Sequence, residues 1–277
     1  MIKYIVRSIV LASAVLLNSC TMDSFLFNTL ALNEYNLSTA IIPAAQVEAV
    51  TLKSGDETLY GFYVKQPDSM RVEPHQVILY SHGNKENIEA YWERVELLYQ
   101  AGFDVFIYDY RGYGMSTGSS SEQGLHEDAT AALNYLRSRA DVDTTQIVDY
   151  GFSLGGVPTM YLAAFQHNPR CVITEAIFAS SEALIRTGAV LDVPGNYLMK
   201  GKYDNAGNSR IRTARLLIIH GTADTFVPYD PHGKEIYAAA NQPKILHLVS
   251  GAAHSGIPST LGTKAYIELI RTFIKGS

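Results

Sequence analysis

Six short, nearly continuous apolar runs alternate along this chain with stretches that have the periodicity of helices. The apolar runs span residues 76–83, 103–110, 145–153, 171–178, 215–221 and 244–249. The helical stretches span residues 87–100, 122–139, 156–166, 231–240 and 261–274. Strands that are buried on both faces of a parallel sheet are apolar throughout, and crossover helices connect such strands. The alternation therefore predicts a doubly wound α/β fold with a mostly parallel sheet.

Two further strand-like segments precede these runs. Residues 47–52 and 59–64 flank the turn sequence Lys-Ser-Gly-Asp-Glu-Thr, which predicts an antiparallel hairpin at the edge of the sheet. The chain is 47% hydrophobic and 18% charged, a composition that suits one well-buried domain and leaves little for a second. We therefore expect a single α/β domain over residues 47–277, in which residues 180–215 form a short cap insertion.

The first twenty residues have the form of an export signal. Lys3 and Arg7 precede an apolar run over residues 9–17, which is short for the roughly 20 residues needed to span a bilayer. The sequence Leu-Asn-Ser-Cys that ends at Cys20 resembles a bacterial lipobox. The resemblance implies a lipoprotein signal peptide over residues 1–19 and an acylated Cys20 that anchors the exported protein, with the outer membrane facing the periplasm as the expected location. An uncleaved anchor is the alternative.

The segment after this signal is expected to be a tether. Residues 20–46 have weak periodicity, so we expect a lipidated tether with one amphipathic segment, and function beginning after it. Once Cys20 carries lipid, Cys171 is the remaining thiol, and the mature chain cannot form an intramolecular disulfide.

Charge and histidine spacing argue against several classes of partner. Removal of Lys3 and Arg7 with the signal lowers the Lys and Arg count from 22 to 20 against 27 Asp and Glu, a net charge of about −7 with no basic stripe for nucleic acid. The 8 histidines lack paired metal-ligand spacing, and no phosphate-cradling glycine loop occurs. We expect a monomer that uses no metal and no cofactor.

Gly151 and Gly155 flank Ser153 in the sequence Gly-Phe-Ser-Leu-Gly, directly after a β-branched segment. A serine on a sharp turn between a strand and a helix has a strained backbone, and side chains at the two flanking positions would collide there. The motif therefore predicts a nucleophile elbow, with backbone N–H groups at the start of the following helix free to face an oxyanion. A glycine-rich turn that holds an ordinary serine is the alternative.

Candidate partners for Ser153 lie in loops that follow other strands, and in open α/β sheets the carboxyl ends of the strands form the ligand crevice. Asn84 follows the first apolar run, and its backbone N–H and that of Leu154 are expected to form an oxyanion hole. Asp224 follows the fifth run, where a carboxylate can orient an imidazole. His254 follows the last run, in a loop of small residues that can bring its ring over the serine.

Other titratable residues in these loops are expected to be structural. His82 precedes the nucleophile and begins its loop, His220 precedes a tight glycine turn, and His247 alternates within a strand. Asp230 precedes Pro231 and is expected to cap a helix.

The order Ser153, Asp224, His254 is that of α/β-hydrolases. The sequences SHGN, YDYRGYGMS, GFSLGG, HGTADTFVP and GAAHSG resemble that superfamily, and within it they are most similar to the Bem46-like serine hydrolases. The resemblance covers nearly all of the chain from residue 47 onward. It implies an α/β-hydrolase fold and esterase, thioesterase or related acyl hydrolase activity, with these three residues as nucleophile, acid and base. It also implies that the loop with Asp109 and Arg111 is scaffolding near the site.

The predicted cap insertion, residues 180–215, could influence which substrates the protein accepts. Its apolar side chains either line an acyl pocket or only pack a helix onto the sheet; they are Leu184, Ile185, Leu191, Val193, Tyr197, Leu198 and Met199. A short cap favours a small or medium acyl ester, or a thioester, over a triglyceride. An acyltransferase or a peptidase on the same triad, and a non-enzymatic binding protein on a hydrolase fold, are the alternatives.

Overall fold

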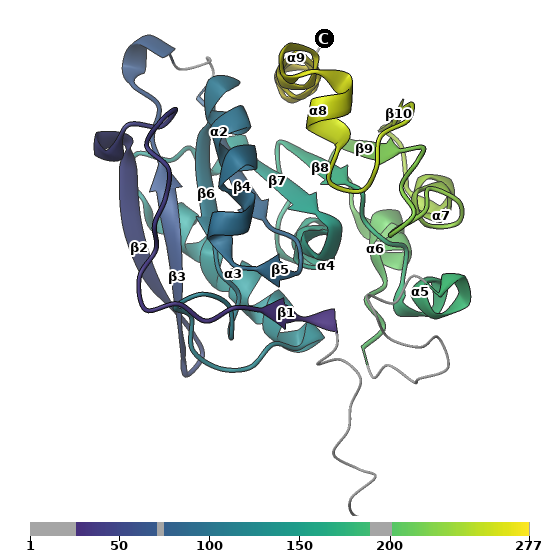
Figure 1. Cartoon of the computed structure of the whole chain (residues 1–277), viewed down its shortest axis with the longest axis horizontal. Helices are drawn as coiled ribbons and strands as arrows, with labels where there is room; N and C mark the ends of the chain where they lie inside the picture. The colour runs from purple at the N-terminus through teal and green to yellow at the C-terminus, as the bar shows by residue number, and fades with distance from the viewer. Residues whose placement is uncertain (1–25, 71–74, 189–200, 277) are drawn as a thin grey trace, which may run out of the picture.

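The structure, a computed structural model, describes residues 26–70, 75–188 and 201–276. At its centre lies an eight-stranded sheet with the strand order β10-β9-β8-β7-β4-β6-β3-β2 (Figure 1). The strands are β2 Val47–Ser54, β3 Glu57–Val64, β4 Val77–Ser81, β6 Asp104–Tyr108, β7 Ile147–Phe152, β8 Cys171–Glu175, β9 Leu216–Gly221 and β10 Lys244–Val249.

The six apolar runs form the parallel part of this sheet, as the sequence predicted. Each neighbouring pair from β10 through β9, β8, β7 and β4 to β6 is parallel. Strands β2 and β3 form the predicted hairpin at the edge, and β3 joins the sheet through an antiparallel pairing with β6. The α/β-hydrolase fold with its mostly parallel sheet and antiparallel edge is confirmed.

Helices cover both faces of the sheet. Helices α2 (Trp92–Gln100) and α9 (Thr263–Lys275) pack on one face and contact each other. Helices α3 (Glu122–Ser138) and α4 (Gly156–Tyr161) pack on the other, and α6 (Asn205–Ile211) and α7 (His232–Ala239) extend this layer (Figure 1). Two further helices are short, and they are α5 (Ser181–Thr187) and α8 (Ile257–Leu261).

Side chains of β4 show why these strands are apolar throughout. Ile78 and Tyr80 pack in the cluster that includes α2, whereas Val77 and Leu79 pack in the cluster that includes α3. Successive residues of a strand point to opposite faces, so a strand between two helical layers must be apolar at every position.

The segment 26–46 is more than the tether that we expected. Asn28–Thr29 (β1) pairs in parallel with Lys85–Glu86 (β5), and Leu26 and Ile42 are fully buried. No α-helix, amphipathic or otherwise, occurs in this described segment. The chain follows an irregular path here, so its buried apolar residues have no regular spacing. The sequence therefore shows no periodic pattern.

The signal peptide predicted over residues 1–19 and the acylation site at Cys20 lie outside the described residues. Within the described part, none of the helices has both the length and the apolar composition to cross a membrane.

The described part of the insertion 180–215 packs onto the domain. Leu184 of α5 is buried in the same core cluster as Phe178 and Tyr203, and α6 contacts α4 and α7. For this part, packing rather than the lining of an acyl pocket is the observed role. Ile185, the next residue of α5, is half-buried. The other apolar candidates lie outside the described residues, and they are Leu191, Val193, Tyr197, Leu198 and Met199.

Candidate active site

Ser153 lies on a sharp turn at the carboxyl end of β7, where a single 3₁₀ turn (Ser153–Gly155) leads into α4. Its φ is 52°, a left-handed conformation that is uncommon for a residue with a side chain. A Cβ on Gly155 would lie 1.9 Å from the carbonyl oxygen of Ser81, and one on Gly151 would lie 2.5 Å from the carbonyl oxygen of Gly155. Both glycines are therefore required by close backbone approach, as expected for an elbow.

The structure brings Ser153, His254 and Asp224 together at the carboxyl edge of the sheet. His254 Nε2 lies 3.0 Å from Ser153 Oγ, and His254 Nδ1 lies 2.8 Å from Asp224 Oδ2. Because an ionised carboxylate only accepts hydrogen bonds, the hydrogen belongs on Nδ1, and the lone pair of Nε2 faces the hydroxyl. This arrangement can remove the proton from Ser153 and stabilise the imidazolium that results.

The Asp224 carboxylate is held by backbone donors of its own loop. Its Oδ1 accepts hydrogen bonds from the N–H groups of Phe226 at 2.9 Å and Val227 at 2.8 Å, which leaves Oδ2 for the imidazole. Behind it, His220 is fully buried, and its Nε2 donates to the carbonyl of Val227 at 2.7 Å. Burial lowers the pKa of His220, so it is a neutral structural residue that supports this loop, as predicted.

Aromatic rings flank the imidazole of His254. The ring centroids of Phe226 and Phe152 lie 4.8 Å and 5.3 Å from that of His254. These contacts restrict the ring to the orientation in which both of its nitrogens have partners.

Asn84 lies in the loop after β4 and lines the same pocket as Ser153. Its side chain donates to the carbonyl of Leu26 at 3.1 Å, and its own carbonyl accepts from Tyr113 Oη at 3.1 Å. The next residue, Lys85, donates its backbone N–H to Tyr91 Oη at 2.8 Å. The loop is therefore fixed beside Ser153, whereas the side chain of Leu154 is buried in the core.

A pocket of about 800 Å³ opens onto Ser153 and His254. Its charged lining side chains, apart from His254, are Lys85, Glu93 and Arg94. Aromatic and amide side chains complete much of its wall, including Phe27, Asn28, Asn84, Tyr91, Phe152 and Phe226.

Sequence reasoning missed Arg94 and the two N-terminal wall residues, Phe27 and Asn28. Arg94 had a signal, because it lies three residues after Tyr91 and four before Leu98, both of which are buried on one face of the helical stretch. A cation on an apolar stripe usually has a specific partner. Phe27 and Asn28 had none, since they lie in the segment of weak periodicity.

The remaining candidates have mostly the structural roles that were predicted. His82 is fully buried, with Nε2 3.1 Å from Asp109 Oδ1, and Asp109 also accepts from the backbone N–H of Ile88 at 3.0 Å. Arg111 pairs with Asp128 at 2.8 Å. These contacts fix the loops behind the site.

The expectation for Asp230 was wrong. The N-cap of α7 is Pro231, and no side chain caps this helix. Asp230 is exposed and pairs with Lys234 at 3.0 Å. The cause is a shift of one residue in the start of the helix, a boundary that sequence patterns locate poorly.

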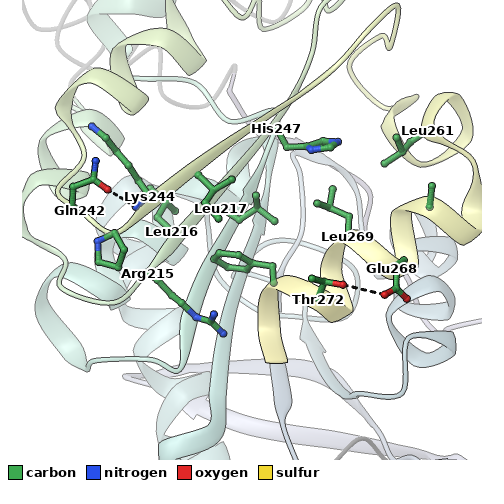
Figure 2. Close-up of a pocket in the computed structure, with 14 residues that line it drawn as sticks. Arg215, Leu216, Leu217, Gln242, Lys244, His247, Leu261, Glu268, Leu269 and Thr272 are labelled. Carbon is green, nitrogen blue, oxygen red and sulfur yellow. Dashed lines mark hydrogen bonds between the residues drawn. The ribbon is translucent and has the colours of Figure 1, made fainter. Parts of the chain in front are cut away.

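A second pocket, of about 650 Å³, lies away from these residues between β9, β10 and α9 (Figure 2). Leucines of β9, α8 and α9 line it, together with His247 of β10, and the lining residue Glu268 accepts a hydrogen bond from Thr272. Its lining residues include no serine or cysteine. It therefore offers neither a serine nor a cysteine as a nucleophile.

Across the described ranges, no group of three or more His, Cys, Asp or Glu side chains is placed to hold a metal ion. The pocket beside Ser153 contains a serine hydroxyl and the imidazole of His254, which are side chains suited to nucleophilic attack and proton transfer.

Comparisons with known proteins identify relatives of this chain. A family model described as serine aminopeptidase, S33, matches residues 72–200. The YfhR protein of Escherichia coli O157:H7 is 33% identical over 230 residues, covering 82% of this chain and 80% of the relative. The alpha/beta hydrolase domain-containing protein aho-3 of Caenorhabditis elegans is 31% identical over 206 residues, covering 72% of this chain and 58% of that protein.

A solved esterase of Pyrococcus furiosus superposes with a TM-score of 0.72 at 17% identity, covering 90% of this chain and 97% of that chain. At 17% identity, this structural similarity shows a shared fold and nothing about the activity of this chain. The relatives, the matching family model and the architecture agree, and the chain belongs to the α/β-hydrolase family and is a hydrolase.

Proposed function

We propose that the protein cleaves carboxylic esters or thioesters with Ser153 as its nucleophile. The observation that carries this proposal is the continuous chain of contacts from Ser153 Oγ through His254 to the Asp224 carboxylate, with Ser153 and His254 lining an open pocket. The sequence resemblance to Bem46-like serine hydrolases supports the same activity.

The mechanism has two steps. His254 Nε2 takes the proton as Ser153 Oγ attacks the acyl carbon, and it returns that proton to the departing alcohol or thiol, which leaves an acyl-enzyme. His254 then takes a proton from water as the water oxygen attacks the acyl carbon, and it returns that proton to Ser153 Oγ when the bond between Oγ and the acyl carbon breaks and the acid is released. Asp224 holds the imidazole in the required tautomer through both steps.

Backbone donors would stabilise the negative charge that develops on the acyl oxygen. We propose the N–H groups of Leu154 and Asn84 for this role, because Leu154 follows the nucleophile at the start of a helical turn and Asn84 lines the same pocket. The tyrosine contacts of the Asn84 loop would hold its donor in place without reorganisation during the reaction.

The peptidase alternative arises from the description of the matching family model. An aminopeptidase must bind a free peptide amine, for which carboxylates are the usual partners. This pocket presents Arg94 and Lys85 against one carboxylate, Glu93, so its charges favour an ester or thioester. An acyltransferase would use the same residues, and product analysis with an added alcohol would show transesterification in place of free acid.

A fluorophosphonate probe tests the proposal directly. Such probes phosphonylate a serine oxygen that a neighbouring base activates, so we expect one adduct per chain by intact-mass analysis, and peptide mapping should place it on Ser153. Ser153→Ala should take up none. A folded wild-type protein that stays unlabelled, or equal labelling of the variant, would contradict the assignment.

We also propose that the exported protein is anchored through acylated Cys20, with the outer membrane facing the periplasm as its location and without an obligatory partner chain. Cys20→Ala should move the protein from the membrane fraction and abolish incorporation of labelled fatty acid, because the thiol is the acceptor. Cys171→Ala is the matched control and should stay in the membrane fraction with its label. Fatty-acid labelling that persists in Cys20→Ala would show that Cys20 is not the acceptor.

A further inference from the structure

Arg94 reaches the pocket from α2, beside the elbow. Its guanidinium carbon lies 3.9 Å from the ring centroid of Phe152, the residue before Ser153. Its Nη2 donates to Glu175 Oε1 at 2.6 Å and lies 3.4 Å from the carbonyl oxygen of Ser255, the residue after His254. The guanidinium therefore contacts the residue before the nucleophile and the residue after the base, and it lines the same pocket as Ser153 and His254.

The hydrogen-bonding capacity of Arg94 is mostly unused. A guanidinium has five N–H groups, and only Nη2 has acceptors among the described residues. Nε is buried without a partner, whereas Nη1, which also lacks a partner, is not among the fully buried atoms. The side chain is 12% exposed, so the exposed part that lines the pocket includes a donor that a ligand can reach.

Glu175 supports Arg94 from the side of the core. Glu175 is fully buried, and its Oε2 accepts from Tyr266 Oη at 2.7 Å and also from Tyr150 Oη. Neighbouring Glu175 raises the pKa of Arg94 above its usual range, against the opposing effect of burial. Arg94 is thus a permanent cation between a buried carboxylate and the pocket.

The other charged residues of the pocket, Lys85 and Glu93, are more exposed than Arg94. Lys85 lies 3.2 Å from Glu86 with 62% of its side chain exposed, and Glu93 is exposed on α2. Water screens such groups strongly, whereas a mostly buried guanidinium retains its attraction for an anion.

We propose that this hydrolase takes esters or thioesters that carry a second, acidic group, a carboxylate or a phosphate, and that Arg94 binds that group. The proposal rests on the function proposed above and names the substrate class of the same site. Nη1 would donate to the acidic group while Nη2 keeps its bond to Glu175, so the ligand anion and Glu175 share one guanidinium.

The test compares pairs of esters that differ in one charge. Mono-p-nitrophenyl adipate and its methyl-capped ester place the charge on the acyl side, and 4-acetoxybenzoate and its methyl ester place it on the leaving group. After correction for spontaneous hydrolysis, we expect wild-type enzyme to favour the acid of at least one pair by about tenfold or more in kcat/KM, the effect of a charge-assisted hydrogen bond. The favoured pair identifies the side that carries the acid.

Variants of the Arg94–Glu175 ion pair provide a sharper test. The quantity to compare is the ratio of kcat/KM for the acidic ester to kcat/KM for its neutral partner, and not the absolute rate. Glu175→Gln leaves the charge of Arg94 uncompensated and should raise the ratio. Arg94→Met combined with Glu175→Gln removes both buried charges and should lower it about tenfold to a hundredfold. Arg94→Lys keeps the charge and should retain a preference for the acid, and it remains informative where the double variant fails to fold.

Lys85→Met is the matched control, because it removes the other cation of the pocket, and it should change the ratio less than loss of Arg94 does. A wild-type enzyme that hydrolyses the neutral esters without preferring either acid would overturn the proposal. So would an unchanged ratio in the double variant, or a larger effect of Lys85→Met. These results differ from failure of the proposed function, in which no ester is cleaved and Ser153 takes up no fluorophosphonate.

Discussion

Ser153→Ala and His254→Ala should each lower kcat for ester hydrolysis by about 10⁴- to 10⁶-fold. Alanine at 153 removes the proposed attacking oxygen, and alanine at 254 removes the proposed base, whose Nε2 lies 3.0 Å from that oxygen. The two residues act as one unit, so the double variant should be no slower than the slower single variant by more than a small factor. Stopped assays with long incubation, on freshly purified variants, would measure these residual rates.

Matched controls separate loss of chemistry from loss of fold. Ser259→Ala removes an exposed hydroxyl from α8, and His247→Ala removes an imidazole from β10, and both should keep activity near the wild-type value. Circular dichroism melts of Ser153→Ala should match those of the wild type, since only one oxygen is lost. Substantial turnover by either Ser153→Ala or His254→Ala would show that another group performs the chemistry.

The loops that carry these residues could be predicted because of a simple property of parallel sheets. Ser153, Asp224 and His254 each follow an apolar run, and parallel strands end at one edge, so the residues converge whatever the lengths of the connections. The two hydrogen bonds at the site and the positive φ of Ser153 depend on the packing of several loops. No local pattern contains that information.

The pocket walls were harder to predict, because they come from irregular chain. Phe27 and Asn28 line the pocket through a two-residue pairing with the loop after β4, which is too short to give a strand pattern. Arg94 was predictable as a helical residue, but its partner Glu175 lies 81 positions along the chain. The described part of the insertion 180–215 had apolar residues suited either to a pocket or to a core, and packing decided between them.

Gly155→Ala should destabilise the fold by about 3 kcal/mol or more, because a Cβ at this position would overlap backbone atoms of Ser81 and His82. Its nearest neighbours would be the carbonyl oxygen and carbon of Ser81, at 1.9 and 2.5 Å, and the carbonyl oxygen of His82, at 2.7 Å. Backbone atoms at the end of a central strand have no rotamer to change, so the strand or the elbow must move. For a domain of this size, thermal unfolding should shift down by roughly 6–12 °C.

Gly256→Ala is the matched control for this prediction. Gly256 lies two residues after His254, yet a Cβ there would meet its nearest atoms at 3.7 Å, an ordinary contact, and its φ is −88°. This variant should melt near the wild-type temperature. Equal melting of Gly155→Ala and wild type would mean that the elbow is looser than the contacts with Ser81 imply. Where Gly155→Ala folds, movement of Ser81 and His82 should also shift Asn84, which follows them in the same loop. A loss of kcat beyond the loss of stability is therefore the expected sign that the proposed oxyanion donor, the Asn84 N–H, has moved.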